Sequence, residues 1–166
     1  IGSFREVTAP PSKEMGGIRF EADGTVSIIT GTLDYGQGHL APFAQVLTEK
    51  LGVPFERVRL VQGDSDELIA GGGTGGSKSI MHSGTAIVEA AAKVVEQGKQ
   101  IASHVLEASA SDIEFAQGRF VIAGTDRAIG IMALAEKLRG GMNLPEGAPR
   151  RLDVQHVSNE PKDASC

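Results

Sequence analysis

The order of apolar and polar residues along the chain predicts strands that alternate with helices. "GIRFEADGTVSIITGT" predicts two strands joined at Asp23-Gly24, a dipeptide that favours hairpin turns. Apolar residues at helical spacing over 40–51 predict a helix, which ends at Gly52 because a proline follows two positions later. "RVRLVQGD" alternates apolar and polar residues and predicts a further strand.

The second half of the chain predicts a long helix, a hairpin and a shorter helix. The long helix is expected from about Ser77, with an apolar face formed by Ile80, Ile87, Ala91, Val94, Ile101, Val105 and Leu106. "IEFAQGRFVI" predicts a hairpin that turns at Gln117-Gly118, and "GIMALAEKLRGG" predicts the shorter helix. The tail from Leu144 onward is rich in proline, glycine and charge, so we expect an irregular crossing segment.

These elements predict an α+β fold. We expect a two-layer α/β sandwich, with a mixed sheet, one long helix and two shorter helices. The short hairpins allow some strand pairs to be antiparallel.

Composition narrows the function classes. The 166 residues are 40% apolar, as in a soluble globular domain. A net charge of −5, one tyrosine and no tryptophan argue against a nucleic-acid surface. No apolar run approaches the roughly 20 residues that cross a bilayer. The single cysteine, Cys166, allows no disulfide within the chain. A cytoplasmic location is therefore expected.

Because the chain opens at Ile1 without a methionine, we expect it to be a piece of a longer protein.

Two glycine clusters carry the strongest functional signal. "GQGH" at 36–39 and "GGGTGGSKS" at 71–79 each directly precede a predicted helix. Glycine leaves backbone N–H groups accessible, and a helix N-terminus attracts anions. We therefore expect Gln37 and Ser77 to lie close enough to share one dinucleotide-sized ligand. The alternative is that both clusters are only flexible connections.

Other chemical motifs are absent or incomplete. A Walker loop fails because Ser77 stands where its last glycine belongs. "GGGTGG" satisfies G-x-G-x-x-G, but no strand runs directly into it and no acidic residue closes a second strand about 20 positions later. The four histidines lack metal-ligand spacing, and the acidic turn at 64–67 fits no EF-hand. No nucleophile motif occurs. The sequence thus indicates binding without catalysis.

"APPSKEMGGIRFEADGTVSIITGTLDYGQGH", "GGGTGGSKS" and the alanine-rich helix after them resemble the molybdenum hydroxylase family. This family comprises xanthine dehydrogenase, aldehyde oxidoreductase and aerobic carbon monoxide dehydrogenase, and the likeness is to their large, molybdopterin-binding subunit. It extends over nearly the whole chain. It implies that residues 1–143 are part of the cofactor-binding domain and that 144–166 are a crossing segment truncated at its C-terminus.

The resemblance implies a set of cofactor-binding residues. They are Tyr35, Gly36, Gln37, Gly38 and His39 in the first cluster, and Gly76, Ser77, Lys78 and Ser79 in the second. The family's cofactor is molybdopterin, here expected in its cytosine dinucleotide form. Its pterin holds the molybdenum, so no metal ligand is expected from the protein. Two positions depart from the family's pattern. Tyr35 stands where relatives carry methionine or histidine, and Lys78 stands where they carry arginine. Lysine keeps the positive charge but lacks the guanidinium group that binds in a bidentate way.

The resemblance also implies what the chain lacks. The family's catalytic glutamate lies in a Gly-Glu-Pro-Pro-like stretch, and Glu146 in "NLPEGAP" has neither that context nor that place. We therefore expect no catalytic residue here, and no activity from the isolated chain. The parent protein is expected to oxidise an aldehyde, an N-heterocycle, CO or a similar substrate with water as the oxygen source. Its partners would be the remainder of the large subunit and subunits or domains carrying 2Fe-2S and FAD. The alternative is a non-enzymatic α/β module that binds an anionic ligand or a partner chain through its glycine loops.

Overall fold

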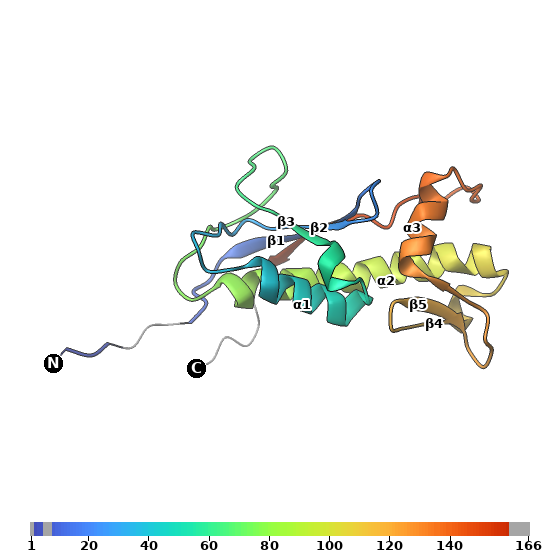
Figure 1. The fold of residues 1–166 in the computed structure, drawn as a ribbon, viewed down its shortest axis with the longest axis horizontal. Helices are drawn as coiled ribbons and strands as arrows, with labels where there is room; N and C mark the ends of the chain where they lie inside the picture. The colour runs from blue at the N-terminus through green and yellow to red at the C-terminus, as the bar shows by residue number, and fades with distance from the viewer. Residues whose placement is uncertain (1, 5–7, 160–166) are drawn as a thin grey trace.

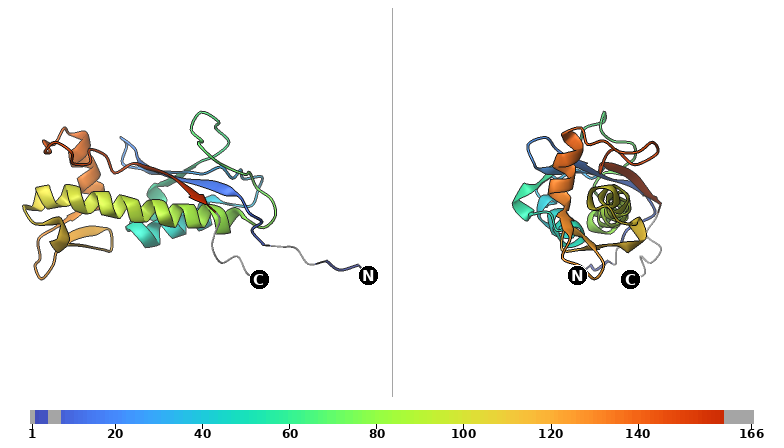
Figure 2. Two further views of the ribbon diagram at one scale, coloured as in Figure 1. Left: turned by 180° about the vertical axis from the view of Figure 1, so that it is seen from behind. Right: turned by 90° about the vertical axis from the view of Figure 1, so that its right-hand side faces the viewer.

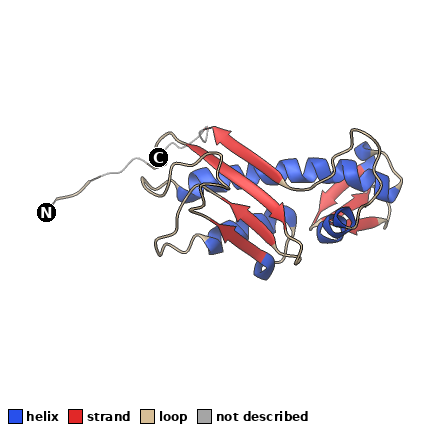
Figure 3. Cartoon of the chain, turned by 90° about the horizontal axis from the view of Figure 1, so that it is seen from above, coloured by secondary structure: helices blue, strands red, loops and turns tan. Residues whose placement is uncertain are grey.

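A computed structural model describes residues 2–4 and 8–159 of the chain, and it confirms the α+β class. The longest element, α2 (Gly84–Leu106), runs along most of the molecule (Figures 1 and 2). Strands β1 (Lys13–Phe20), β2 (Val26–Ile29), β3 (Val58–Val61) and β7 (Val154–Asn159) form one sheet. Strands β4 (Ile113–Ala116), β5 (Arg119–Ile122) and β6 (Ala128–Gly130) form a second, separate sheet (Figure 3).

The four-stranded sheet is mixed, as expected. Its order is β3-β2-β1-β7, and β1 is antiparallel to both of its neighbours, whereas β2 and β3 are parallel. Helix α1 (Leu40–Leu51) makes the crossover between these two parallel strands. It ends at Gly52, whose φ of 63° is the left-handed C-cap that the sequence predicts.

The sheet packs on α1 and the first half of α2, while the second sheet and α3 (Ile131–Arg139) pack against the last half of α2. The largest core side chains, which are fully buried, belong to both parts: Met15, Ile18, Ile28, Phe43, Leu47, Leu51, Ile87, Ile101, Ile113, Phe120, Ile131 and Leu134. Two glycines allow the closest approaches of α2. A Cβ at Gly16 would collide with the Ala86 carbonyl oxygen, and one at Gly98 would collide with the Phe120 ring.

Two expectations from the sequence need correction. The tail is irregular only until Val154, because Val154–Asn159 form β7, which pairs with β1; residues 160–166 lie outside the described part. Ile80 is 47% exposed, because the turn of π-helix η2 (Ser79–Ser83) precedes α2 and shifts the helical register.

Gly16→Ala is expected to destabilise the chain. Its added Cβ would meet the backbone of α2, including the Ile87 nitrogen at 2.8 Å, and backbone atoms cannot turn away as a side chain can. Overpacking of this kind typically costs about 1–3 kcal/mol. The free energy of unfolding in urea measures the effect. Gly75→Ala is the matched control, since no atom lies within 4 Å of its Cβ position. Equal stability of the two variants would contradict the packing described here.

Candidate functional site

Both glycine clusters follow the carboxyl ends of parallel, neighbouring strands. We call residues 31–39, after β2, the first glycine segment, and residues 71–79, in the connection from β3 to α2, the second glycine segment. Carboxyl ends of parallel strands meet at one edge of a sheet, where open α/β sheets bind ligands. The two segments accordingly lie at the same end of the molecule, where α2 begins (Figures 1 and 2).

The two segments touch through their backbones. A Cβ at Gly71 would lie 2.5 Å from the Gly31 Cα, so only glycine fits at this crossing. Nearby, the Thr74 hydroxyl donates to the Leu33 carbonyl oxygen at 2.7 Å and accepts from the Leu33 N–H at 3.0 Å. The segments that carry Gln37 and Ser77 are therefore in direct contact.

Asp34 organises the first segment. Its Oδ1 accepts from the N–H groups of Gly36 and Gln37 at 2.7 Å and of Gly38 at 3.2 Å, and its Oδ2 accepts from the His39 N–H at 2.7 Å. These bonds, led by that from Gly36, lower the pKa of Asp34 from its ordinary value. The N–H groups that the sequence offers to a ligand anion thus already hold a carboxylate.

Gln37 remains available to a ligand through its side chain. Its Oε1 accepts from the Tyr35 N–H at 2.5 Å, and within the described residues the structure gives its Nε2 no partner. Gly36 and Gly38 have φ values of 111° and 74°, which L-residues rarely adopt, and no atom lies within 4 Å of either Cβ position. The Tyr35 N–H thus orients the Gln37 carboxamide, which lies in an open part of the surface.

His39 belongs to a buried polar network beneath the first segment. The Nε2 of Gln62 donates to the hydroxyls of Thr30 at 3.1 Å and Thr32 at 2.7 Å, and lies 3.4 Å from His39 Nδ1. The His39 ring packs on Phe43, with centroids 5.3 Å apart. His39 is 5% exposed, so its visible role is to support the segment from within.

The second segment is wound through left-handed conformations. Gly73, Gly76 and Ser77 have φ values of 68°, 60° and 51°, and such a conformation is strained for a non-glycine residue such as serine. The Lys78 ammonium donates to the Gly72 carbonyl oxygen at 2.8 Å, so it braces the segment while keeping its charge beside it. Ser77 is exposed at the tip of this turn.

The second glycine segment leads into η2 and α2, whose first backbone N–H groups receive no hydrogen bond from an N-cap side chain. The N-cap residues of η2 and α2, Lys78 and Ser83, make no side-chain capping bond. The first N–H groups of a helix have no partner within the helix, and they carry its partial positive charge. The N-cap residue of α1, His39, likewise makes no side-chain capping bond. The two helix starts differ in the charge beside them: the Asp34 carboxylate lies just before α1, and the Lys78 ammonium lies at the start of η2.

Apolar side chains are exposed around the two segments. Tyr35 is 72% exposed, and Leu40, Ile69 and Ile80 are also exposed. All four lie on the two segments or within two residues of them. An apolar face exposed at this end favours a piece of a larger subunit over a free-standing module, whose surface would be closed and polar.

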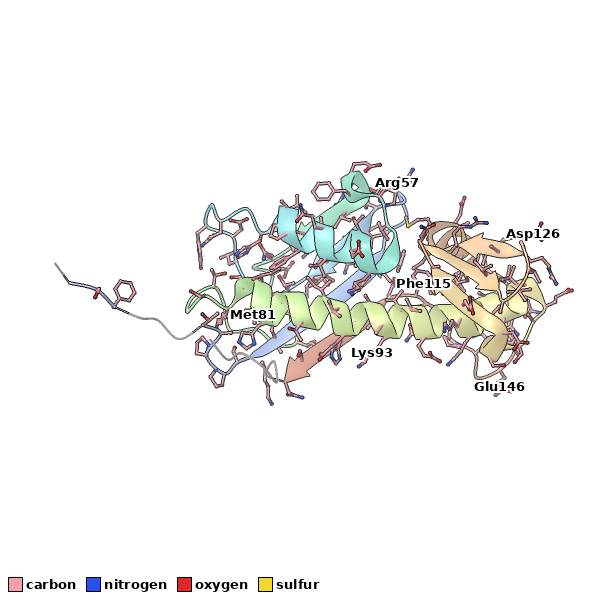
Figure 4. All side chains as sticks on the ribbon, turned by 90° about the horizontal axis from the view of Figure 1, so that it is seen from below. Arg57, Met81, Lys93, Phe115, Asp126 and Glu146 are labelled. Carbon is pink, nitrogen blue, oxygen red and sulfur yellow. The ribbon has the colours of Figure 1, made fainter. Side chains whose placement is uncertain are left out.

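Among residues 2–4 and 8–159, no group of three or more His, Cys, Asp or Glu side chains is placed to hold a metal ion. Glu146 lies in the part of the molecule that contains α3, at the opposite end of α2 from Met81 (Figure 4). In the same described ranges, no helix is long and apolar enough to cross a membrane.

Comparison with known families identifies the fold. The model of the molybdopterin cofactor-binding domain family matches residues 1–158. The chain belongs to this family. It is a segment of a molybdenum hydroxylase large subunit, in agreement with the resemblance noted in the sequence.

The chain spans about a seventh of the length of the curated relatives that it matches. This molybdopterin cofactor-binding domain is 35% identical over 116 residues to the carbon monoxide dehydrogenase large chain of Hydrogenophaga pseudoflava, covering 70% of this chain and 14% of that one. It is 34% identical over 122 residues to the 6-hydroxypseudooxynicotine dehydrogenase complex subunit gamma of Paenarthrobacter nicotinovorans, covering 74% and 15%.

Two solved structures share the fold. The carbon monoxide dehydrogenase of Oligotropha carboxidovorans superposes with a TM-score of 0.83 at 28% identity, over 94% of this chain and 20% of that one. Quinoline 2-oxidoreductase of Pseudomonas putida 86 gives 0.72 at 26% identity, over 92% and 19%. The domain thus spans less than a quarter of these chains.

The Asp34 carboxylate predicts a pH dependence of the first segment. Because its folded pKa is lowered, the ionised carboxylate stabilises the segment at neutral pH, and this stabilisation is lost as the pH falls through the folded pKa. The amide chemical shifts of Gly36 and His39, followed by NMR, should titrate with a midpoint below the ordinary value of about 3.9. Asp34→Asn should abolish this transition, and Asp66→Asn, at an exposed position, should not. A wild-type midpoint at or above the ordinary value would refute this assignment.

Proposed function

We propose that the two glycine segments form one wall of the molybdopterin site in the large subunit of a molybdenum hydroxylase. The observation that carries the proposal is the contact of the segments at Gly31 and Gly71, before the starts of two helices. The family match supports the class of ligand. All nine residues from Tyr35 to His39 and from Gly76 to Ser79 remain part of this proposal.

The two segments divide the contacts. Asp34 already satisfies the backbone N–H groups of the first segment, so Gln37 contributes through its Nε2, a donor suited to the polar edge of a pterin. A phosphate fits the second segment, because the start of η2 presents backbone N–H groups that its N-cap side chain does not cap and Lys78 adds positive charge beside it. His39 takes part indirectly, by supporting the first segment from within. The donor in the first segment therefore suits the pterin of the cofactor, and the donors in the second segment suit its phosphate.

The bound cofactor supplies the molybdenum and the redox chemistry of substrate hydroxylation. The residues of this chain bind and orient it and perform no chemical step themselves. The pterin carries the metal, which agrees with a donor set made of amides, hydroxyls and an ammonium group. The base that completes catalysis is expected from another part of the subunit.

The cytosine dinucleotide form, the substrate class and the redox partners are finer parts of the proposal. The relatives' names support oxidation of CO or of an N-heterocycle, and an aldehyde or a similar substrate is kept in the proposal as a carbon that water-derived oxygen can also attack. One relative is named as the subunit of a complex, which supports assembly with chains that carry 2Fe-2S and FAD. A cytoplasmic location completes the proposal.

Gln37→Leu in the full-length enzyme is expected to lower cofactor occupancy. Leucine keeps the approximate volume but leaves the partner on the ligand unpaired, which costs about 1–3 kcal/mol. Molybdenum per protein, measured by mass spectrometry, should fall, and turnover should fall with it. Thermal stability should change little, since Gln37 is exposed and outside the core.

The matched control is Gln155→Leu, an exposed glutamine on β7 away from both segments. It should keep full molybdenum content. If Gln37→Leu also keeps full molybdenum and normal turnover, Gln37 is only a turn residue.

The isolated 166-residue chain is expected to show no hydroxylase activity, with or without added cofactor. It supplies one wall of the site and no catalytic base. Turnover assays with aldehydes and purines measure this directly, with the full-length enzyme as the positive control. Activity of the isolated chain above the buffer blank would show that the roles assigned here are wrong.

A further inference from the structure

Glu14 is an acidic side chain in the interior at the edge where the two glycine segments meet. It is the second residue of β1 and is 1% exposed. Burying a carboxylate is costly unless hydrogen bonds compensate it. Glu14 therefore requires a structural reason, and none of the roles proposed above uses it.

The carboxylate binds the first segment. Its Oε1 accepts from the Gly31 N–H at 2.7 Å and from the Met15 N–H at 2.9 Å. A Cβ at Gly31 would lie 2.7 Å from this same oxygen. Glu14 thus sits directly against the glycine at which the two segments cross.

The same carboxylate acts on the second segment. Burial raises the pKa of Glu14, and the backbone N–H groups of Gly31, Met15 and Gly72 and the charge of Lys78 oppose the rise. Lys78 is itself bound to the Gly72 carbonyl oxygen at 2.8 Å. Two bonded pairs, Glu14 with Gly31 and Lys78 with Gly72, thus lie beside each other between β1 and both segments.

We propose that Glu14 is a positioning residue that sets the spacing of the two glycine segments before the cofactor binds. The inference rests on the proposed function for its link to the cofactor, but its geometric part concerns this chain alone. A carboxylate suits the role because it accepts several N–H donors at once and forms stronger bonds than a neutral acceptor. An apolar side chain at position 14 would fill the volume but would accept no hydrogen bond from the Gly31 N–H, so it would not hold the first segment in place.

Glu14→Gln in the full-length protein tests this inference. Glutamine keeps the size but loses the charge and one acceptor oxygen. In cofactor-free protein, hydrogen exchange at the Gly31 and Gly72 amides should become about tenfold faster, as expected when charge-assisted bonds weaken. Exchange at Ile18 and Ile28 in the core should not change. In loaded protein, molybdenum content should fall.

Two further variants sharpen the test. Glu67→Gln is the control: it removes a carboxylate from the connection between β3 and α2 that binds Arg19 at 2.9 Å, and it should change neither Gly31 exchange nor molybdenum content. Glu14→Asp keeps the charge but shortens the side chain by one methylene, so it separates reach from charge. Its molybdenum content should also fall, and this variant decides the matter if Glu14→Gln does not fold.

The outcomes distinguish this inference from the proposed function. Unchanged exchange at Gly31 and Gly72, equal acceleration throughout the core, or full molybdenum content in either Glu14 variant would overturn the positioning role. If the wild-type protein carries no molybdenum, the proposed function fails instead. The exchange comparison in cofactor-free protein then still decides whether Glu14 holds the two segments.

Discussion

The crossing of two backbones at Gly31 and Gly71 is the constraint on which the site depends. A side chain on either residue would push the segments apart, because the Cβ of one would overlap the Cα of the other. The parallel pairing of β2 and β3 brings the two chains to this edge, and α1 supplies the crossover that parallel pairing requires. The arrangement of strands in the mixed sheet therefore brings two glycine segments, which are distant in sequence, into contact.

Electrostatics then separates the tasks of two segments that look alike in sequence. Asp34 provides an internal anion for the first segment, whereas Lys78 places a positive charge at the start of η2 in the second. A second anion beside Asp34 would be repelled, while one at the start of η2 would meet N–H donors and Lys78. This asymmetry is the physical basis for assigning the phosphate to one segment and a polar ring edge to the other.

Local signals made much of the fold predictable. The Asp23-Gly24 hairpin, the Gly52 C-cap and the long helix follow from turn chemistry and periodicity, and the structure has all three. Strand β7 was not predictable, because its pairing with β1 is made across more than 130 residues and its sequence contains little apolar alternation. The exposure of Ile80 depends on a single π-helical turn, which leaves no pattern in the sequence.

The site was predictable in outline but not in its supporting contacts. The glycine spacing indicates the two segments, yet the N–H groups of the first segment bind Asp34, whose position two residues before a glycine was the available signal. Glu14 and Gln62 had no such signal, because their partners come from distant parts of the chain.

The most direct test of the central claim is a crystal structure of the full-length enzyme with its cofactor bound. Our account predicts one molecule in contact with both segments: a phosphate oxygen within hydrogen-bond distance of N–H groups at the start of η2, and a pterin atom within that distance of Gln37 Nε2. A cofactor that contacts only one segment, or that lies away from the Gly31–Gly71 crossing, would contradict it.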